Sequence, residues 1–423
     1  MRRTIIILII LLWVADYLPA KIIYVNANGP GDPGSGSYED PFRKIQTAID
    51  SASNGDVIEL QPGVYTGQGN YGLDPDGVAI TIRSIDPNDA DVVSETIIDP
   101  DKAGRAFYFH SKGDSNCVIL GLTIRNGRVA AGYGGGIYCN DCSPTIVNCI
   151  IRDSLAWCGG GLYCYDSNSQ IKGCTIYNNY ATGDGGGLEC WWGNPKITNC
   201  IVINNKAASN GGGIDCWSNG NLIITNCTVV GNMATSGGGV YSYESYPLIT
   251  NSIVWDNGSY PIQALNGDIA VTYSDVQNGW GGDGNIDADP CFAVFDGIFE
   301  ANLWDFHLKS YYGRWNPDGK TWVADSSTSP CIDLGDPGSD WNDEPWPNGK
   351  RINMGAYGGT IEASKNGNIA DLNVDGIVNF IDFGQQARLW MVEQECIEDL
   401  TNNGVIDFSD LKVIVDNWLW QRE

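Results

Sequence analysis

The strongest constraint on this chain is a unit of about 26 residues that occurs five times in succession. Runs of three glycines begin at positions 134, 159, 185, 211 and 237, and each leads into a similar phrase: GIYC, GLYC, GLEC, GIDC and GVYS. About ten residues later comes a second phrase: TIVNCII, QIKGCTI, KITNCIV, IITNCTV and LITNSIV. Units this short bury little by themselves, so the core has to form by stacking equivalent residues of successive units.

Within each unit, apolar and other residues alternate in short runs separated by glycine and asparagine. Such alternation predicts short β-strands and tight turns and leaves no room for helices. Three short strands per unit, stacked at one strand spacing per turn, predict a right-handed parallel β-helix. We therefore expect a mainly β solenoid, with residues 21–362 forming the β-helix and its end caps.

Eight of the fourteen cysteines fall at fixed places in the unit and form two rows along the predicted solenoid. We expect their thiols to point inward as small core residues. A straight row of thiols cannot surround a tetrahedral zinc ion, so these rows should not bind metal. Cys291 and Cys331, outside the rows, are the pair best placed for a disulfide in an exported protein. The rows are Cys139, Cys164, Cys190 and Cys216, and Cys149, Cys174, Cys200 and Cys227.

An asparagine recurs just before the second row of cysteines. Asn148, Asn199, Asn226 and Asn251 occupy this place, and Gly173 replaces it in one unit. Asparagine and glycine both tolerate the left-handed backbone conformation. The pattern therefore predicts an asparagine ladder at a bend of the coil.

Residues 1–20 have the pattern of a secretory signal peptide. Two arginines precede an apolar run from Ile5 to Val14, and Ala20 suits cleavage. An uncleaved membrane anchor is the alternative, but the run is short for a membrane span. We expect a protein that is secreted to the extracellular space or cell surface and has no membrane contact after cleavage. The net charge of −27 argues against nucleic-acid binding, which needs a basic face.

The segment before the first unit, DPFRKIQTAIDSA, places Phe42, Ile45, Ile49 and Ala52 on one face of a short helix that would cover the open end of the solenoid. GDVIELQPGVYTG follows at 55–67. Together with the glycine and cysteine repeats, these segments resemble the secreted right-handed β-helix proteins of the pectin-lyase-like superfamily over roughly residues 21–362. NIDADPCF, SPCIDLGDP and RINMGAYGGT are similar to the closing segment of a bacterial branch. The resemblance implies the fold, whereas the activities of this superfamily range over lyases, hydrolases, esterases and non-enzymatic binders.

The strand after each triple glycine should present two columns of side chains on the outside of the solenoid. One column contains Glu189 and Asp215 on neighbouring coils, between tyrosines. Sugar rings stack on aromatic side chains, and carboxylates accept hydrogen bonds from sugar hydroxyls. The sequence therefore predicts a face that binds an extracellular polysaccharide. Its predicted substrate-binding residues are Tyr163, Tyr165, Trp191, Trp217 and Tyr243.

Glu189 and Asp215 are the candidate catalytic residues. Their backbones should lie about one strand spacing, ~4.8 Å, apart. At this distance, repulsion between the two carboxylates would raise the pKa of one of them. One group could then act as the acid and the other as the base or nucleophile. A β-elimination lyase needs a Lys or Arg base, which neither column contains. The sequence leaves open whether the protein is a glycoside hydrolase, a polysaccharide lyase or a binder without catalysis. A non-catalytic structural or adhesive cell-surface protein is the alternative.

Residues 363–423 form a separate acidic region with two segments of calcium-loop spacing, DLNVDGIVNFID at 371–382 and DLTNNGVIDFSD at 399–410. Each has oxygen ligands at positions 1, 3, 5, 7, 9 and 12 and a glycine at position 6. The region is therefore predicted to bind two Ca²⁺ ions. The predicted ligands are Asp371, Asn373, Asp375, the Ile377 carbonyl, Asn379 and Asp382, and Asp399, Thr401, Asn403, the Val405 carbonyl, Asp407 and Asp410.

Aspartate at position 12 and the apolar helix expected after each loop make this pair of loops resemble a type I dockerin. The resemblance implies an EF-hand-like module that docks onto a cohesin-like partner on a scaffold or cell surface. The sequence departs from the usual recognition pair of small hydroxyl residues, because Phe380-Ile381 and Phe408-Ser409 stand near the loop ends. Calcium-dependent folding is thus the better supported of the two implications.

Overall fold

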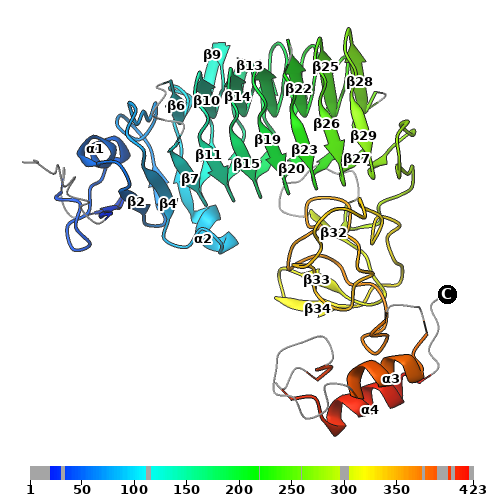
Figure 1. The fold of residues 1–423 in the computed structure, drawn as a ribbon. Coiled ribbons are helices and arrows are strands. Elements are labelled where there is room, and N and C mark those ends of the chain that lie inside the picture. Colours follow the sequence, from blue (N-terminus) through cyan, green and yellow to red (C-terminus); the bar gives the residue numbers. More distant parts are fainter. Residues whose placement is uncertain are drawn as a thin grey trace, which may run out of the picture.

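The computed structural model describes residues 20–29, 34–110, 116–218, 220–258, 260–295, 304–373, 377–387, 399–401 and 405–418. Most of the predicted signal peptide and the predicted ligands Asp375 and Asn403 lie outside these residues. Strands of successive coils pair in parallel, side by side along one long axis (Figure 1). The chain is therefore a mainly β solenoid, as the repeat predicts.

Two long parallel sheets carry the second phrase of each repeat and line the core with equivalent residues, such as Ile146, Ile171 and Ile197. The first sheet consists of β1 Ile22–Val25, β2 Val57–Leu60, β4 Thr81–Ser84, β7 Val118–Leu120, β11 Thr145–Val147, β15 Gln170–Lys172, β19 Lys196–Thr198, β23 Ile223–Thr225, β26 Leu248–Thr250 and β29 Ala270–Thr272. The second sheet consists of β3 Gly63–Tyr65, β5 Thr96–Ile98, β8 Thr123–Arg125, β12 Ile150–Arg152, β16 Thr175–Tyr177, β20 Ile201–Ile203, β24 Thr228–Val230, β27 Ile253–Trp255 and β30 Asp275–Val276.

The third sheet carries the strand that follows each triple glycine. It consists of β6 Phe107–Phe109, β10 Ile137–Asn140, β14 Leu162–Tyr165, β18 Leu188–Trp191, β22 Ile214–Trp217, β25 Val240–Tyr243 and β28 Ile262–Leu265. A fourth sheet, which the sequence pattern does not predict, precedes the glycines. It consists of β9 Arg128–Tyr133, β13 Leu155–Cys158, β17 Tyr180–Ala181 and β21 Lys206–Ala207.

The triple glycines turn the chain from the fourth sheet into the third. Gly185 has a φ of 63°, and a Cβ there would lie 2.5 Å from the Cβ of Glu189. A Cβ on Gly186 would lie 2.3 Å from the carbonyl oxygen of Gly212 on the next coil. Glycine recurs at this corner because both the backbone conformation and the neighbouring coil exclude a side chain.

The N-terminal end of the solenoid is covered by α1 (Ile45–Ser51), whose Ile45 and Ile49 are buried in the main core. This confirms the predicted capping helix. The first coil already includes β1, which pairs with β2. A second short helix, α2 (Ala90–Glu95), was not predicted and lies in the turn between β4 and β5.

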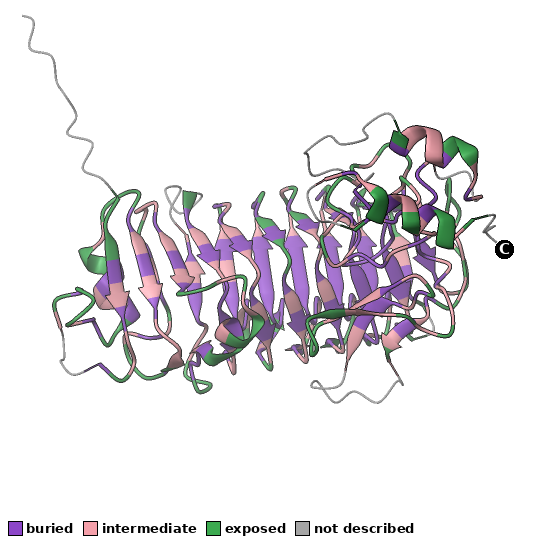
Figure 2. Ribbon diagram, turned by 90° about the horizontal axis from the view of Figure 1, so that it is seen from below, coloured by how far each residue is buried: buried purple, intermediate pink, exposed green. Residues whose placement is uncertain are grey.

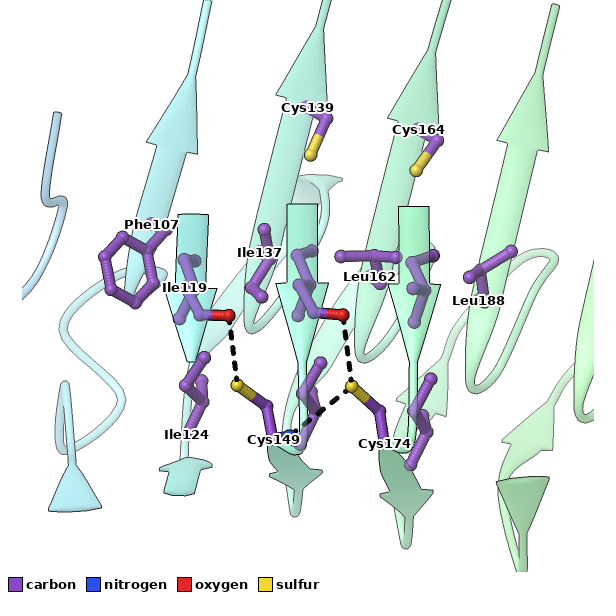
Figure 3. Packing of buried hydrophobic residues seen from close by; sticks show 14 of the residues in the cluster. Phe107, Ile119, Ile124, Ile137, Cys139, Cys149, Leu162, Cys164, Cys174 and Leu188 are labelled. Atoms are coloured by element: carbon purple, nitrogen blue, oxygen red, sulfur yellow. Dashed lines mark hydrogen bonds between the residues drawn. The ribbon is translucent and has the colours of Figure 1, made fainter. Parts of the chain in front are cut away.

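The inside of the solenoid is a continuous apolar core, in which purple buried segments face one another along the axis (Figure 2). Each buried isoleucine or leucine contributes roughly 1.5–3 kcal/mol of hydrophobic stabilisation. The cysteines of both rows are buried, free thiols, which confirms the prediction. In the second row the thiols donate to carbonyls of the preceding coil, as Cys149 does to Ile119 and Cys174 to Ile146 (Figure 3).

The predicted disulfide between Cys291 and Cys331 is wrong. Both are free thiols, and the Cys331 thiol donates instead to the buried carboxyl group of Asp275 at 3.1 Å. A hydrogen bond to this carboxyl group of β30 satisfies the sulfur without a second cysteine.

Two asparagine ladders run along the solenoid. The predicted one is confirmed, since Asn148, Asn199, Asn226 and Asn251 have φ values of 50–53°. A second, internal asparagine ladder joins the second sheet to the fourth and is almost completely buried. Side-chain amides of successive coils bond one another there, at 2.9–3.0 Å; its members are Asn179, Asn205, Asn232 and Asn257.

The described residues between 291 and 362 form a closing segment that lies against the β-helix (Figure 1). It contains two hairpins, β31 (Phe292–Val294) with β32 (Asp305–Leu308) and β33 (Arg314–Asn316) with β34 (Thr321–Val323). The predicted asparagine ladder holds it in place. The Asn199 amide donates to the carbonyls of Ala356 and Gly358, and Asn226 donates to Gly358 as well.

The last part of the chain contains α3 (Phe380–Ala387) and α4 (Phe408–Asp416), which lie side by side (Figure 1). Leu372, Val378, Leu400 and Ile414 form a small core there, against which Trp346 of the closing segment packs. Neither these nor the other helices among the described residues are long and apolar enough to cross a membrane.

Candidate functional site

The outer face of the third sheet carries a row of rings that we call the aromatic column: Tyr165, Trp191, Trp217 and Tyr243. These residues are register partners on four neighbouring strands. The ring centroids of Trp191 and Trp217 lie 5.5 Å apart at an interplanar angle of 23°, and those of Trp217 and Tyr243 lie 4.4 Å apart. All four side chains are partly exposed. The structure thus brings four of the five predicted substrate-binding residues together on an accessible face.

Glu189 and Asp215 are register partners on β18 and β22, one column away from the rings. The sequence predicts that they face solvent, but they are only 1% and 0% exposed. One oxygen of Glu189 and both carboxyl oxygens of Asp215 have no hydrogen-bond partner among the described residues. A buried carboxylate without a hydrogen-bond partner is costly, so burial favours the protonated form of both groups.

Burial raises the pKa of Glu189 to about 8, and the nearby charge of Asp184 adds to this effect. Hydrogen bonds from the Cys158 thiol and the Gly159 amide oppose it. Burial, followed by the charges of Glu189 and Asp184, also raises the pKa of Asp215 well above its usual range. Two neighbouring carboxyl groups with raised pKa values can divide the roles of acid and base.

The fourth sheet is the physical reason for this unexpected burial. Two of its strands, β9 and β13, end directly before a triple glycine, and the residues at this place lie over the first column of the third sheet. Cys158 ends β13 and adjoins Glu189. Tyr163, predicted to bind substrate, is covered in the same way, because the ring of Tyr133 lies 4.6 Å from its ring. Together with Tyr133 and Cys158, Tyr163 therefore forms a wall around the carboxyl pair and does not belong to the exposed face.

Tyr133, Cys158 and Asp184 belong to the site but were not predicted. The available signal is positional, since each stands directly before a triple glycine. Their chemical diversity hides the pattern. Asp184 is held in place by Asn210 of the next coil, whose backbone and side-chain nitrogens both donate to it at 2.9 Å.

Two cavities lie elsewhere, where the closing segment meets the β-helix. One of about 380 Å³ is lined by Asn148, Asn199, Tyr357 and Glu362, among others. The other, of about 600 Å³, lies between the loop around Asp89 and the hairpin that contains Trp315. Neither is lined by the carboxyl pair or the aromatic column.

Both predicted calcium loops close around the aspartate at their twelfth position. The buried Asp382 accepts hydrogen bonds from the backbone of Asn373 at 3.2 Å and Asn379 at 2.8 Å. Asp410 accepts from Thr401 and Asp407, both at 2.8 Å.

The donor groups at the described loop positions are all oxygens, which suit a hard cation such as Ca²⁺. In the described part of the chain, no three acidic, histidine or cysteine side chains gather closely enough to hold a metal ion. Whether these loops bind calcium stays a prediction.

A family model described as a right handed beta helix region matches residues 108–278. The match and the strand pairing together make this chain a right-handed parallel β-helix. One similar solved structure is the pectate lyase Pel9A, which is 16% identical with a TM-score of 0.45 over 82% of this chain and 96% of that one. Another is a rhamnogalacturonan lyase, which is 13% identical with a TM-score of 0.37 over 74% of this chain and 97% of that one. A pectin methylesterase from Aspergillus niger is also similar, at 13% identity and a TM-score of 0.31 over 60% of this chain and 87% of that one. No curated protein matches the sequence.

Proposed function

We propose that this protein binds an extracellular polysaccharide along the aromatic column. The observation that carries the proposal is the row of partly exposed rings on four adjacent strands, beside a buried pair of carboxyl groups. A strand spacing of about 4.8 Å sets the rings at intervals close to the length of one sugar residue. Because Trp191, Trp217 and Tyr243 pack ring against ring, the glycan would make its apolar contacts along the exposed parts of these rings, and the fixed register would give the glycan a direction.

The test is a polysaccharide array probed with the full-length protein and with a Trp191→Ala, Trp217→Ala variant. Because each ring contributes on the order of 1 kcal/mol of aromatic contact, the variant should bind the retained glycan at least about tenfold more weakly. Tyr311→Ala is the control, since Tyr311 is 56% exposed but lies in the closing segment. If no glycan is retained by the wild type, the proposal fails and the adhesive alternative gains support.

Cleavage of the bound glycan is a second candidate function, favoured by the raised pKa values of Glu189 and Asp215. One carboxyl group would protonate the glycosidic oxygen while the other acts as base or nucleophile at the sugar carbon. Because the wall of Tyr133 and Cys158 covers the pair, this step requires the wall to open. Single Glu189→Gln and Asp215→Asn variants test it. Unchanged release of sugar products in both would exclude this mechanism.

Residues 363–423 complete the proposal as a calcium-binding, dockerin-like module of a secreted protein. Ligand spacing repeated in two loops, and the closure of both loops around Asp382 and Asp410, support the calcium part. The module would anchor the β-helix to a cohesin-like partner. A pull-down with immobilised cohesin domains, in calcium and in EDTA, tests this role; lack of binding in calcium would contradict it.

A further inference from the structure

A second row of side chains runs beside the aromatic column, two residues earlier on each strand. We call it the polar row; it consists of Glu189, Asp215, Tyr241 and Gln263, which are register partners on β18, β22, β25 and β28. Residues two apart on a strand point to the same face of the sheet and lie roughly 6.5–7 Å apart. A glycan that lies along the aromatic column is therefore within reach of the polar row.

The polar row and the adjoining indole contain five buried side-chain atoms that have no hydrogen-bond partner among the described residues. They are one carboxyl oxygen of Glu189, both of Asp215, the amide oxygen of Gln263 and the indole nitrogen of Trp217. Folded proteins rarely leave such atoms unpaired, because each of them costs stability. Their gathering on the outer face of one sheet therefore indicates that this part of the face binds a ligand.

The five atoms offer both roles in a hydrogen bond. Burial favours the protonated form of both carboxyl groups, so each of these can donate as well as accept. The indole nitrogen of Trp217 only donates, and the side-chain oxygen of Gln263 only accepts. The indole lies close enough to the Asp215 carboxyl group to oppose the rise in its pKa, but outside hydrogen-bond geometry. Hydroxyl groups, which both donate and accept, match this mixture.

We infer that the polar row binds free hydroxyl groups of the glycan, so that the protein selects polysaccharides with free hydroxyl groups over their O-acetylated forms. This inference rests on the proposed function. The carboxyl pair becomes accessible only when the wall around it opens, whereas Gln263, on the last strand of the sheet, is partly exposed. A site built to hydrogen-bond a hydroxyl group rejects a derivative that lacks it, because buried polar atoms of the site then stay unpaired.

The experiment compares binding of the full-length protein to xylan, β-glucan and mannan, each in its unmodified and its O-acetylated form. We expect at least one unmodified polysaccharide to bind tenfold or more tightly than its acetylated form. Binding of the acetylated forms as tightly as the unmodified ones would overturn the inference and leave the proposed function standing. If neither form of any of the three is bound, the inference fails, and the polysaccharide array decides the proposed function separately.

A change in one indole separates hydrogen bonding from ring contact. Trp217→Phe keeps a ring in the aromatic column but removes the buried N–H group. Trp191→Phe is the matched control for ring size, because the Trp191 nitrogen is not one of the unpartnered atoms. Trp217→Phe should lower the affinity for the unmodified polysaccharide at least fivefold more than Trp191→Phe does. Equal losses would show that only ring size matters and would contradict the inference.

Gln263 provides a test that also distinguishes binding from a structural role. Gln263→Leu removes an unpartnered polar atom, so the melting temperature should stay the same or rise, while the affinity for the unmodified polysaccharide falls at least fivefold. Gln170→Leu, at an exposed position of β15 in the first sheet, is the control and should leave the affinity unchanged. Unchanged affinity in Gln263→Leu would remove this residue from the site, and a lower melting temperature would assign it a structural role.

Discussion

Two buried carboxyl groups on adjacent coils make the stability of this β-helix depend on pH. The folded-state pKa of Glu189 is raised from 4.5 to about 8, and that of Asp215 is raised too. When folding raises the pKa of an acidic group, the folded state gains stability that is fully present at pH values below the pKa of the unfolded state. This stability is lost as the pH rises through the pKa of the folded state. For Glu189 alone, this corresponds to on the order of 5 kcal/mol between the two pKa values.

We therefore expect the melting temperature of the β-helix to fall between pH 5 and pH 9. A Glu189→Gln, Asp215→Asn variant keeps the shapes but cannot ionise, so its profile should be flatter. Asp275 and Glu344, with pKa values raised by burial to about 6 and about 7, titrate in the same range in both proteins. The informative quantity is thus the difference between the two profiles in thermal unfolding. Parallel profiles would show that the pair does not titrate there.

At the scale of the elements, the internal asparagine ladder fastens the second sheet to the fourth. The side-chain oxygen of Asn205 accepts from the backbone and side chain of Asn179, and its amide donates to Ile176 and Asn232, all at 2.8–3.0 Å. Asn205→Ala removes these four buried bonds and leaves their partners unsatisfied. We expect it to destabilise the fold by about 3 kcal/mol, measured by urea unfolding.

Asn194→Ala is the control for the ladder. Asn194 also donates its amide to an asparagine of the preceding coil, Asn168, but this bond is exposed to water. Its loss should cost less than about 0.5 kcal/mol. Similar shifts of the urea midpoint in both variants would mean that burial does not decide the contribution of a ladder bond.

The strands also differ in how well the sequence predicts them. Residues such as Ile146, Cys190 and Asn199 have counterparts in most coils under the same constraint, so the repeat predicts the direction of their side chains and the conformation of their backbone. The fourth sheet has no comparable signal, because a two-residue strand such as β17 has no alternation to detect. Whether Glu189 is buried depends on that sheet. The sequence could therefore predict the column to which Glu189 belongs, but not the fourth sheet that buries it.

At the scale of the whole molecule, the C-terminal module is joined to the β-helix through the closing segment. Trp346 packs on the small core of the module and donates its indole hydrogen to the Ile369 carbonyl at 3.2 Å. That core is small, and Asp382 and Asp410 bury charge-bearing groups inside the loops. We propose bound calcium as a further source of stability for this module.

We expect scanning calorimetry of the full chain in calcium to show a transition of the module that falls by about 10 °C or more in EDTA, since calcium at about 100 times its Kd stabilises by roughly 2.7 kcal/mol. The β-helix transition should not move, because its core contains none of the loop ligands. Asp371→Asn with Asp399→Asn removes one ligand charge from each loop and should bring the calcium curve close to the EDTA curve. A module transition that is the same in calcium and EDTA would contradict structural calcium. The small core and its contact with Trp346 would then have to stabilise the module unaided.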